Sequence, residues 1–270
     1  MLLVDASTED DVERPALSVR LLGAPDVVAA DGSVARFERS KALELLTWMV
    51  THRTRSTRPA ARTALWDQDV RDATFANVVS EARRTMARLV PCPDDDEWLR
   101  RTLTDELSLH DEVRSDADVV RVALSAARGQ APADVLAALA PAVELVRGMP
   151  FADTTYLWPD AEGITTDLIL LATSVCAEHA RAALEVDDVE GVFWSTGRGL
   201  QVISGQETLI GLRMRAHAAA GDRSGVRREW ESYERVVTSD PWSDGELAPK
   251  LVALRKQLLS PISSPPDDPS

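Results

Sequence analysis

The sequence has very few cysteines. Cys92 and Cys176 are its two thiols among 270 residues, and their separation fits neither a metal-binding pair nor a disulfide framework. Such cysteine usage is typical of a reducing compartment. The four histidines follow no metalloprotease spacing. Cys176 and His179 share one helix face, but two ligands on a mostly apolar helix do not make a zinc site. We therefore expect neither a metal site nor a cofactor.

Long hydrophobic runs and enzyme motifs are scarce as well. No apolar stretch reaches the roughly 18–20 residues that cross a bilayer. The opening MLLVDASTEDDVERP lacks the basic and apolar regions of a secretory signal. Gly197-Arg198-Gly199 lacks the third glycine and the preceding strand of a dinucleotide site, and no Gly-x-Ser-x-Gly motif is found. We expect a cytoplasmic protein without direct membrane insertion and without enzymatic activity.

Basic residues are also outnumbered by acidic residues. The chain has 30 Lys and Arg against 44 Asp and Glu, a net charge of −14, which argues against nucleic-acid binding over the whole surface. The distribution is uneven, however. Residues 36–88 hold 11 basic and 6 acidic residues, whereas residues 116–260 hold 14 and 21. The first segment is the one that could offer a basic surface to DNA, although an acidic protein partner would suit it too.

That basic segment contains the outline of a helix-turn-helix, in residues 57–90, TRPAARTALWDQDVRDATFANVVSEARRTMARLV. A short amphipathic helix begins with Thr57 as N-cap and Pro59 in its first turn, where a missing N–H costs little. An acidic turn over residues 67–72 separates it from a longer helix that carries three arginines. A short helix, a tight polar turn and an arginine-bearing helix are typical of DNA-binding modules.

The flanking segments complete the pattern of a winged helix. Residues 17–30 predict two short strands, and Asp31-Gly32 predicts a hairpin turn before a third strand near residues 33–37. Ser40 is expected to cap a helix with a broad apolar side. A loop of composition PCPDDDE follows the central helices, and residues 98–110 predict a terminal hairpin. The expected order is a small antiparallel sheet, three helices and a hairpin.

From Ser115 onward the pattern is helical only. Ser115 or Asp116 caps the first helix, which closes at Gly129. Short junctions such as Asp187-Asp188 require neighbouring helices to pack antiparallel, and small residues at close-contact positions resemble tetratricopeptide (TPR) hairpins. Further helices are expected near residues 132–146, 164–184, 189–203, 207–220, 224–239 and 246–260.

Aromatic residues make up only 5% of the chain, so their positions are informative. We expect Trp48 and Trp66 in the core of the winged helix. Five others could form an exposed recognition groove or, in the interpretation that we favour, fill a helical core. They are Phe151, Tyr156, Trp158, Phe193 and Trp194.

Several stretches, in this order, resemble the winged-helix half of the actinobacterial antibiotic regulatory proteins (SARP), which has an OmpR-type fold. They are LSVRLLGAPDVVAADGS, FERSKALELLTWMVTHR, TALW, the arginine-bearing helix and LSLHDEVRSD. Residues 116–259 are similar to the bacterial transcriptional activation domain (BTAD) of that family through LAALAPAVELVRGMPF, HARAALE and LRMRAHAAAGDRSGVRREWESYERVV. The resemblance covers residues 17–259 and depends on the order of the motifs.

The resemblance implies a predominantly helical protein: an α+β winged helix followed by an all-α, TPR-like domain. The expected divisions are a disordered acidic lead-in (1–16), the winged helix-turn-helix domain (17–110), the BTAD (111–260) and a disordered tail (261–270).

The resemblance also places residues 72–89 in the major groove of DNA and the hairpin 98–109 against the minor groove. Candidate contacts are Arg58, Arg62, Asn77, Ser80, Arg83, Arg84, Arg88, Arg100 and Arg101, since arginine pairs bidentately with phosphate or guanine. The alternative is a solvated face in which arginines pair with acids such as Glu81. Residues 94–96 add three further acids just before the hairpin.

Two functions follow. The first is a DNA-binding transcriptional regulator whose helical domain forms a homodimer or contacts RNA polymerase. The second is a protein-interaction scaffold that has lost most of its DNA affinity, and such a scaffold could be the cytoplasmic part of a longer, membrane-tethered protein. The locally basic segment favours the first, and the acidic residues 116–260 favour the second.

Overall fold

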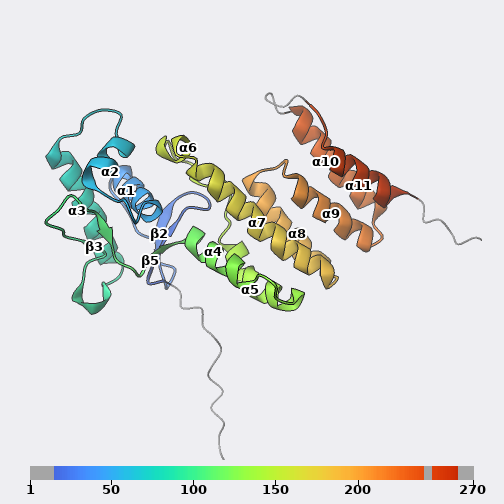
Figure 1. The fold of residues 1–270 in the computed structure, drawn as a ribbon, viewed down its shortest axis with the longest axis horizontal. Coiled ribbons are helices and arrows are strands. Elements are labelled where there is room, and N and C mark those ends of the chain that lie inside the picture. The colour runs from blue at the N-terminus through green and yellow to red at the C-terminus, as the bar shows by residue number, and fades with distance from the viewer. Residues whose placement is uncertain (1–14, 240–244, 261–270) are drawn as a thin grey trace, which may run out of the picture. The chain divides into compact units, whose positions relative to one another are not determined.

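The computed structural model describes residues 15–239 and 245–260 (Figure 1). Disorder is expected for residues 1–16 and 261–270; of these, residues 1–14 and 261–270 lie outside the described residues, and Pro15 and Ala16 are described. The described chain forms a winged helix with a small sheet, followed by helices only, which is the expected fold class.

The chain divides into two compact units (Figure 1). The first contains the chain up to Val119 together with Phe151–Gly163, and the second contains Val120–Pro150 and the chain from Ile164 onward. The division therefore differs from the expected boundary after residue 110. Residues 111–119 and Phe151–Gly163, which the sequence places in the helical domain, belong instead to the unit that contains the winged helix.

A three-stranded sheet opens the first unit. Strands β1 (Leu17–Arg20) and β2 (Asp26–Ala29) pair antiparallel, as the sequence predicts, and β5 (Val113–Ser115) pairs parallel to β1 on its other side. The third strand expected near residues 33–37 is reduced to a single bridge at Val34. Strand β5 has no signal in the sequence, because three residues show too little alternation.

The junction after β5 explains why the first unit extends beyond residue 110. Asp116 is fully buried, and its carboxylate accepts hydrogen bonds from the backbone N–H groups of Leu21 and Leu22 at 2.8–3.0 Å. The Phe151 N–H donates to the Leu21 carbonyl at 3.2 Å. Two segments that are distant in sequence are thus bound to the end of β1.

Three helices follow the sheet: α1 (Ser40–Thr51), α2 (Arg58–Leu65) and α3 (Asp72–Leu89). Helix α2 begins directly after the expected N-cap, and α3 spans the residues 72–89 that the resemblance implies. Thr57 is the N-cap of α2, and its hydroxyl accepts a hydrogen bond from the Ala60 N–H at 3.3 Å. Local capping chemistry is sufficient to position these two helices.

The start of α1 differs from the expectation. Ser40 is the first helical residue, and the N-cap is Arg39, whose side chain accepts no capping hydrogen bond. Instead, the Arg39 N–H donates to the carboxylate of Glu81 on α3 at 2.8 Å. A tertiary contact therefore takes the place of the expected local cap.

The wing follows α3 after a short 3-10 turn, η1 (Pro93–Asp95). Strands β3 (Leu99–Arg100) and β4 (Ser108–Leu109) pair antiparallel, which confirms the expected hairpin in shortened form. The Leu107 N–H donates to the Ser56 carbonyl at 2.9 Å. The wing is therefore hydrogen-bonded to the segment that leads into α2.

Helix α6 (Trp158–Ala161) lies in the first unit, and most of the second unit is a succession of helices with short junctions. All the bounds but two fall within two residues of the expected ones: α4 ends three residues before Gly129, and the last helix begins three residues late. The helices are α4 (Asp116–Ala126), α5 (Pro132–Glu144), α7 (Ile164–Glu185), α8 (Val189–Val202), α9 (Glu207–Ala219), α10 (Arg223–Ser239) and α11 (Pro249–Leu259).

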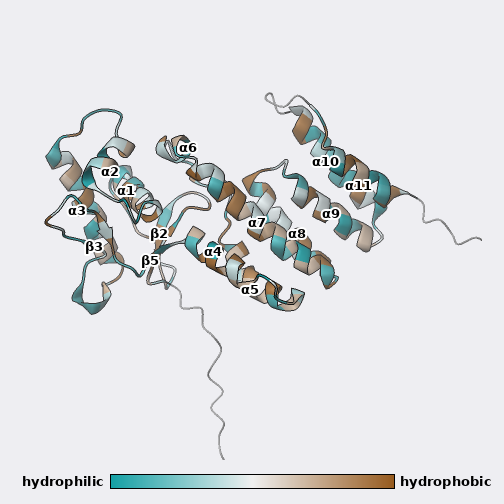
Figure 2. Cartoon of the chain, viewed as in Figure 1, coloured by the Kyte–Doolittle hydropathy of each residue, from teal (hydrophilic) through white to brown (hydrophobic). Residues whose placement is uncertain are grey.

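The last three helices illustrate how the second unit is packed. Hydrophobic and hydrophilic residues alternate along its helices (Figure 2), and Met214, Trp230 and Leu251 belong to one buried cluster. The Tyr233 hydroxyl accepts a hydrogen bond from the Ala248 N–H at 3.0 Å, so this buried phenol contributes both apolar area and a polar contact.

Candidate nucleic-acid interface

Helix α3 is amphipathic, with one face in the core and one face exposed. Phe75, Val79, Ala82 and Met86 are at most 3% exposed, and their spacing follows the helical repeat. The opposite face includes Ala73, Ala76, Asn77, Arg84, Ala87 and Arg88, all of which are exposed. Its small residues leave room for a close approach to a flat or grooved partner.

Four of the candidate DNA contacts share this side of α3. Asn77, Ser80, Arg84 and Arg88 are separated by three or four residues, and neighbours at this spacing lie on one side of a helix. Arg88 donates to the Thr85 hydroxyl at 3.0 Å. Within residues 15–239 and 245–260, no hydrogen bond or ion pair engages the side chains of Asn77 and Arg84. Both are available to a partner.

Arg83 points elsewhere. It is half-buried, its Nε donates to the Leu99 carbonyl at 2.7 Å, and it lies 3.6 Å from the Glu97 carboxylate. Burial lowers the pKa of this guanidinium. Arg83 thus connects α3 to the first strand of the wing, and the structure does not group it with Arg84 and Arg88.

Arg58 and Arg62 belong to α2 and are both half-buried. Arg62 forms an ion pair with Asp72 at the start of α3, and its guanidinium lies 5.0 Å from the ring centroid of Phe75. The backbone N–H of Arg58 donates to the Asp105 carbonyl at 2.7 Å, next to the tip of the wing. Helix α2 is therefore linked to the wing where it begins and to the start of α3 through Arg62 in its last turn.

The two arginines of the wing are each paired with an acid four residues earlier. Arg100 Nε lies 2.8 Å from Asp96, and Arg101 Nη1 lies 2.8 Å from Glu97. The backbone N–H of Glu97, followed by Arg100, lowers the pKa of the Asp96 carboxyl. The exposed fraction of the Arg101 side chain is 75%, against 37% for Arg100, so Arg101 is the more accessible cation.

The position of Glu81 contradicts the alternative interpretation, in which the arginines of α3 pair with acids on a solvated face. The sequence suggests a solvated acid that would pair with the arginines of α3, but Glu81 is 2% exposed. Its carboxylate instead accepts the Arg39 N–H and lies 3.5 Å from the Arg39 guanidinium. Sequence reasoning missed this role, because a buried acid inside an amphipathic helix looks like a polar interruption.

The aromatic residues divide between the two units. Phe151 and Trp158 are buried in the first unit, where the Trp158 ring meets His52 edge to face at 5.7 Å. His52 lies 2.6 Å from the Glu162 carboxylate and stacks on Trp48. Desolvation by burial raises the pKa of Tyr156 and the pKa of Glu44 near this cluster. Trp48 is buried as expected, whereas Trp66 is half-buried.

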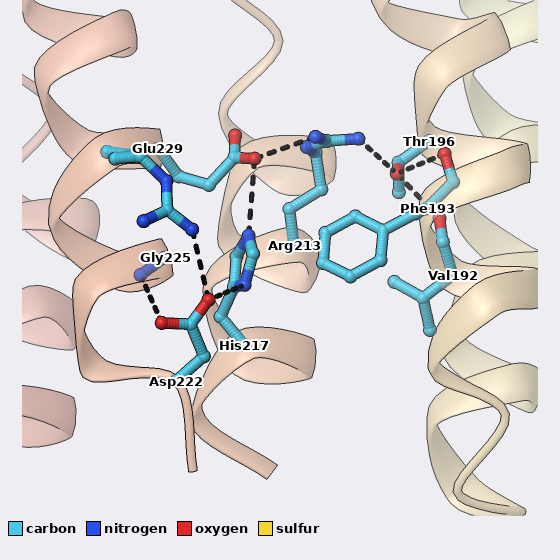
Figure 3. Close-up of polar contacts among 9 residues, drawn as sticks. Val192, Phe193, Thr196, Arg213, His217, Asp222, Gly225 and Glu229 are labelled. Atoms are coloured by element: carbon cyan, nitrogen blue, oxygen red, sulfur yellow. Dashed lines mark hydrogen bonds and ion pairs between the residues drawn. The ribbon is translucent and has the colours of Figure 1, made fainter. Parts of the chain in front are cut away.

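Phe193 and Trp194 lie in the second unit, and Phe193 lies beside a network of polar side chains (Figure 3). Arg213 lies 2.7 Å from Glu229 and 4.8 Å from the ring centroid of Phe193. The imidazole of His217 faces two carboxylates: Nδ1 is 3.1 Å from Asp222, and Nε2 is 3.5 Å from Glu229. Trp194 is 37% exposed and meets His179 rather than this network.

In the part of the chain that the structure describes, no group of three or more His, Cys, Asp or Glu could hold a metal ion. Cys176 and His179 are both buried in α7, and desolvation raises the pKa of the Cys176 thiol to about 12. The described helices also include none with the length and apolar character needed to cross a membrane.

The comparisons with known proteins concern the fold. No family model matches the sequence, and no curated protein matches it either. Mycobacterium tuberculosis EmbR, solved in complex with a low-affinity phosphopeptide, is similar in structure, with a TM-score of 0.65 and 20% sequence identity. The match covers 92% of this chain and 66% of EmbR, so the chain spans slightly less than two thirds of that protein. This chain therefore has the winged-helix and helical-domain fold of EmbR, as the resemblance to SARP regulators predicts.

Proposed function

We propose that the chain is a DNA-binding transcriptional regulator. In this proposal α3 enters the major groove of double-stranded DNA and the β3–β4 wing approaches the adjacent minor groove. The observation that carries the proposal is the exposed face of α3, where the side chains of Asn77 and Arg84 have no hydrogen bond or ion pair with other described residues. Asn and Arg are the side chains that read adenine and guanine edges bidentately, and Arg also binds phosphate.

The likeness of the fold to EmbR supports the regulatory role. We propose further that the second unit forms a homodimer or contacts RNA polymerase or another protein, and that the protein is cytoplasmic and not an enzyme. Small residues at helix contacts and several exposed apolar side chains, such as Val122 and Leu170, are consistent with a protein partner for this unit.

The test is fluorescence anisotropy of the full chain on a random-sequence DNA duplex between about 50 and 200 mM salt, where roughly micromolar or weaker non-specific binding is expected. The variant Arg84→Ala/Arg88→Ala should weaken binding and flatten the salt dependence by about one unit for each phosphate that is no longer bound. The matched control is Arg215→Ala/Arg227→Ala, which removes the same charge from exposed positions of α9 and α10. An equal decrease in affinity in both variants would reject α3 as the DNA-binding helix.

A second function, a protein-interaction scaffold with weak or no DNA binding, is favoured by one observation. Four of the candidate arginines pair with nearby carboxylates: Arg62 with Asp72, Arg100 with Asp96, and both Arg83 and Arg101 with Glu97. Absence of DNA binding at the lowest salt would favour this second function. Protein partners that bind residues 116–260 would then be sought.

A further inference from the structure

We propose that three carboxylates of the first unit, Asp72, Asp96 and Glu97, compete with DNA phosphates for the arginines of the interface and so restrain its affinity. We call these three residues the pairing carboxylates. The proposal rests on the DNA-binding function proposed above and concerns how strongly the protein binds any duplex.

Each pairing carboxylate holds an arginine of the interface. Asp72, at the first turn of α3, pairs with Arg62 of α2. Asp96 and Glu97 precede β3 and pair with Arg100 and Arg101 of the wing, each at 2.8 Å. The wing and α2 therefore present neutral pairs where the sequence alone suggests free cations.

These pairs are exposed enough to exchange. In each pair one side chain is more than a third exposed: Asp72 is 93%, Arg100 37% and Arg101 75% exposed. Their partners Arg62, Asp96 and Glu97 are 32%, 36% and 31% exposed. An exposed ion pair in water adds little to stability, so breaking it is a small loss. A phosphate binds the planar guanidinium bidentately and releases counterions from the duplex, which favours the exchange.

Glu97 shows how the exchange can proceed without dismantling the wing. Its carboxylate lies 2.8 Å from Arg101 and 3.6 Å from Arg83. Arg83 is only 15% exposed and also donates to the Leu99 carbonyl. When DNA takes Arg101, Glu97 keeps Arg83 as a partner, and the link between α3 and the wing persists.

The test compares two triple variants of the full chain with equal charge. The variant Asp72→Asn/Asp96→Asn/Glu97→Gln removes the pairing carboxylates but keeps an oxygen acceptor at each position. The control Asp67→Asn/Asp69→Asn/Asp95→Asn neutralises three exposed acids of the same unit, none of which forms an ion pair with a described residue. Asp95 has a φ of 54°, which asparagine tolerates.

The measurement is the anisotropy titration described above, with thermal unfolding as a check that all three proteins are folded. Removal of each pair should raise DNA affinity by about two- to fivefold beyond the control. The triple variant should therefore bind about ten- to a hundredfold more tightly than the control, with a salt slope steeper by about 0.9 for each arginine released.

The outcomes separate this inference from the proposed function. Tighter and more salt-dependent binding by the first variant than by the control supports the inference, including the case in which the unmodified chain does not bind. Equal binding by the two variants overturns the inference, while binding by the unmodified chain leaves the proposed function standing. If none of the three proteins binds DNA, both are rejected.

Discussion

An arginine–carboxylate pair of the first unit, Arg62–Asp72, and one of the second, Arg213–Glu229, lie in different surroundings. In the first unit, Asp72 is 93% exposed where it pairs with Arg62 on the surface. In the second, Glu229 and Arg213 are 15% and 22% exposed, and they share a network with His217. Exposed pairs contribute little and exchange readily, whereas a desolvated pair is strongly destabilising to break, since one charge is left behind without a partner. The surface pairs are suited to exchange, and the enclosed network is suited to holding α8, α9 and α10 in place.

The largest expected effect comes from breaking the enclosed network. Glu229→Ala removes the partner of Arg213 and one of the two carboxylates that face His217 (Figure 3). We expect a decrease of about 2–3 kcal/mol in the free energy of unfolding, because Arg213, left without its carboxylate partner, is only 22% exposed. Urea unfolding followed by circular dichroism measures it. Glu229→Gln, which keeps the acceptor oxygen, is the control and should be clearly less destabilised; equal decreases would mean that the hydrogen bonds contribute nothing beyond the charge, which both variants remove.

An effect of intermediate size is expected at Asp222, whose carboxylate makes the stability of the fold depend on pH. The pKa of this carboxyl lies below its ordinary value of 3.8, first through the N–H of Gly225 and then through Arg228 and His217. A carboxyl whose pKa is lower in the folded than in the unfolded protein stabilises the fold at any pH above its unfolded pKa. This stabilisation disappears as the pH falls through the folded pKa.

The variant Asp222→Asn isolates that contribution, because asparagine still caps the start of α10. The variant should be less stable than the unmodified chain at pH 7, and the two should converge below about pH 4. Acid titration of the unfolding midpoint provides the measurement. A stability difference that stays constant from neutral pH to strong acid would show that the charge is not its cause.

The smallest effect is expected at the surface. Asp72→Asn breaks the exposed pair with Arg62, but the free energy of unfolding should change by less than about 0.5 kcal/mol. The same change should still raise DNA affinity if the pairing carboxylates act as proposed. A destabilisation as large as that of Glu229→Ala would remove the contrast between the two units.

The elements that the sequence predicted best are those with strong local signals. Helix α3 follows the expected acidic turn and spans Asp72–Leu89, as the resemblance implies, and its apolar positions follow the helical repeat. Helix α2 begins where Thr57 can cap it. The candidate DNA contacts stay predictions, since no contact with DNA is present to test them.

The elements that the sequence missed depend on distant partners. Strand β5 forms only because Val113–Ser115 can pair with β1, almost a hundred residues earlier. Arg39 needs no side-chain cap because Glu81 reaches its N–H from α3. Neither contact can be predicted from the local periodicity of the sequence.

The sequence by itself determined the helices, the order of sheet, helices and hairpin, and the location of the basic segment, because propensity, capping and hydrophobic period act over a few residues. Only the tertiary structure decided which charges are free. Arg83 turns to the wing, the pairing carboxylates neutralise Arg62, Arg100 and Arg101, and Arg84 remains available. Charge pairing depends on distances of a few ångströms between side chains, and the folded backbone sets those distances.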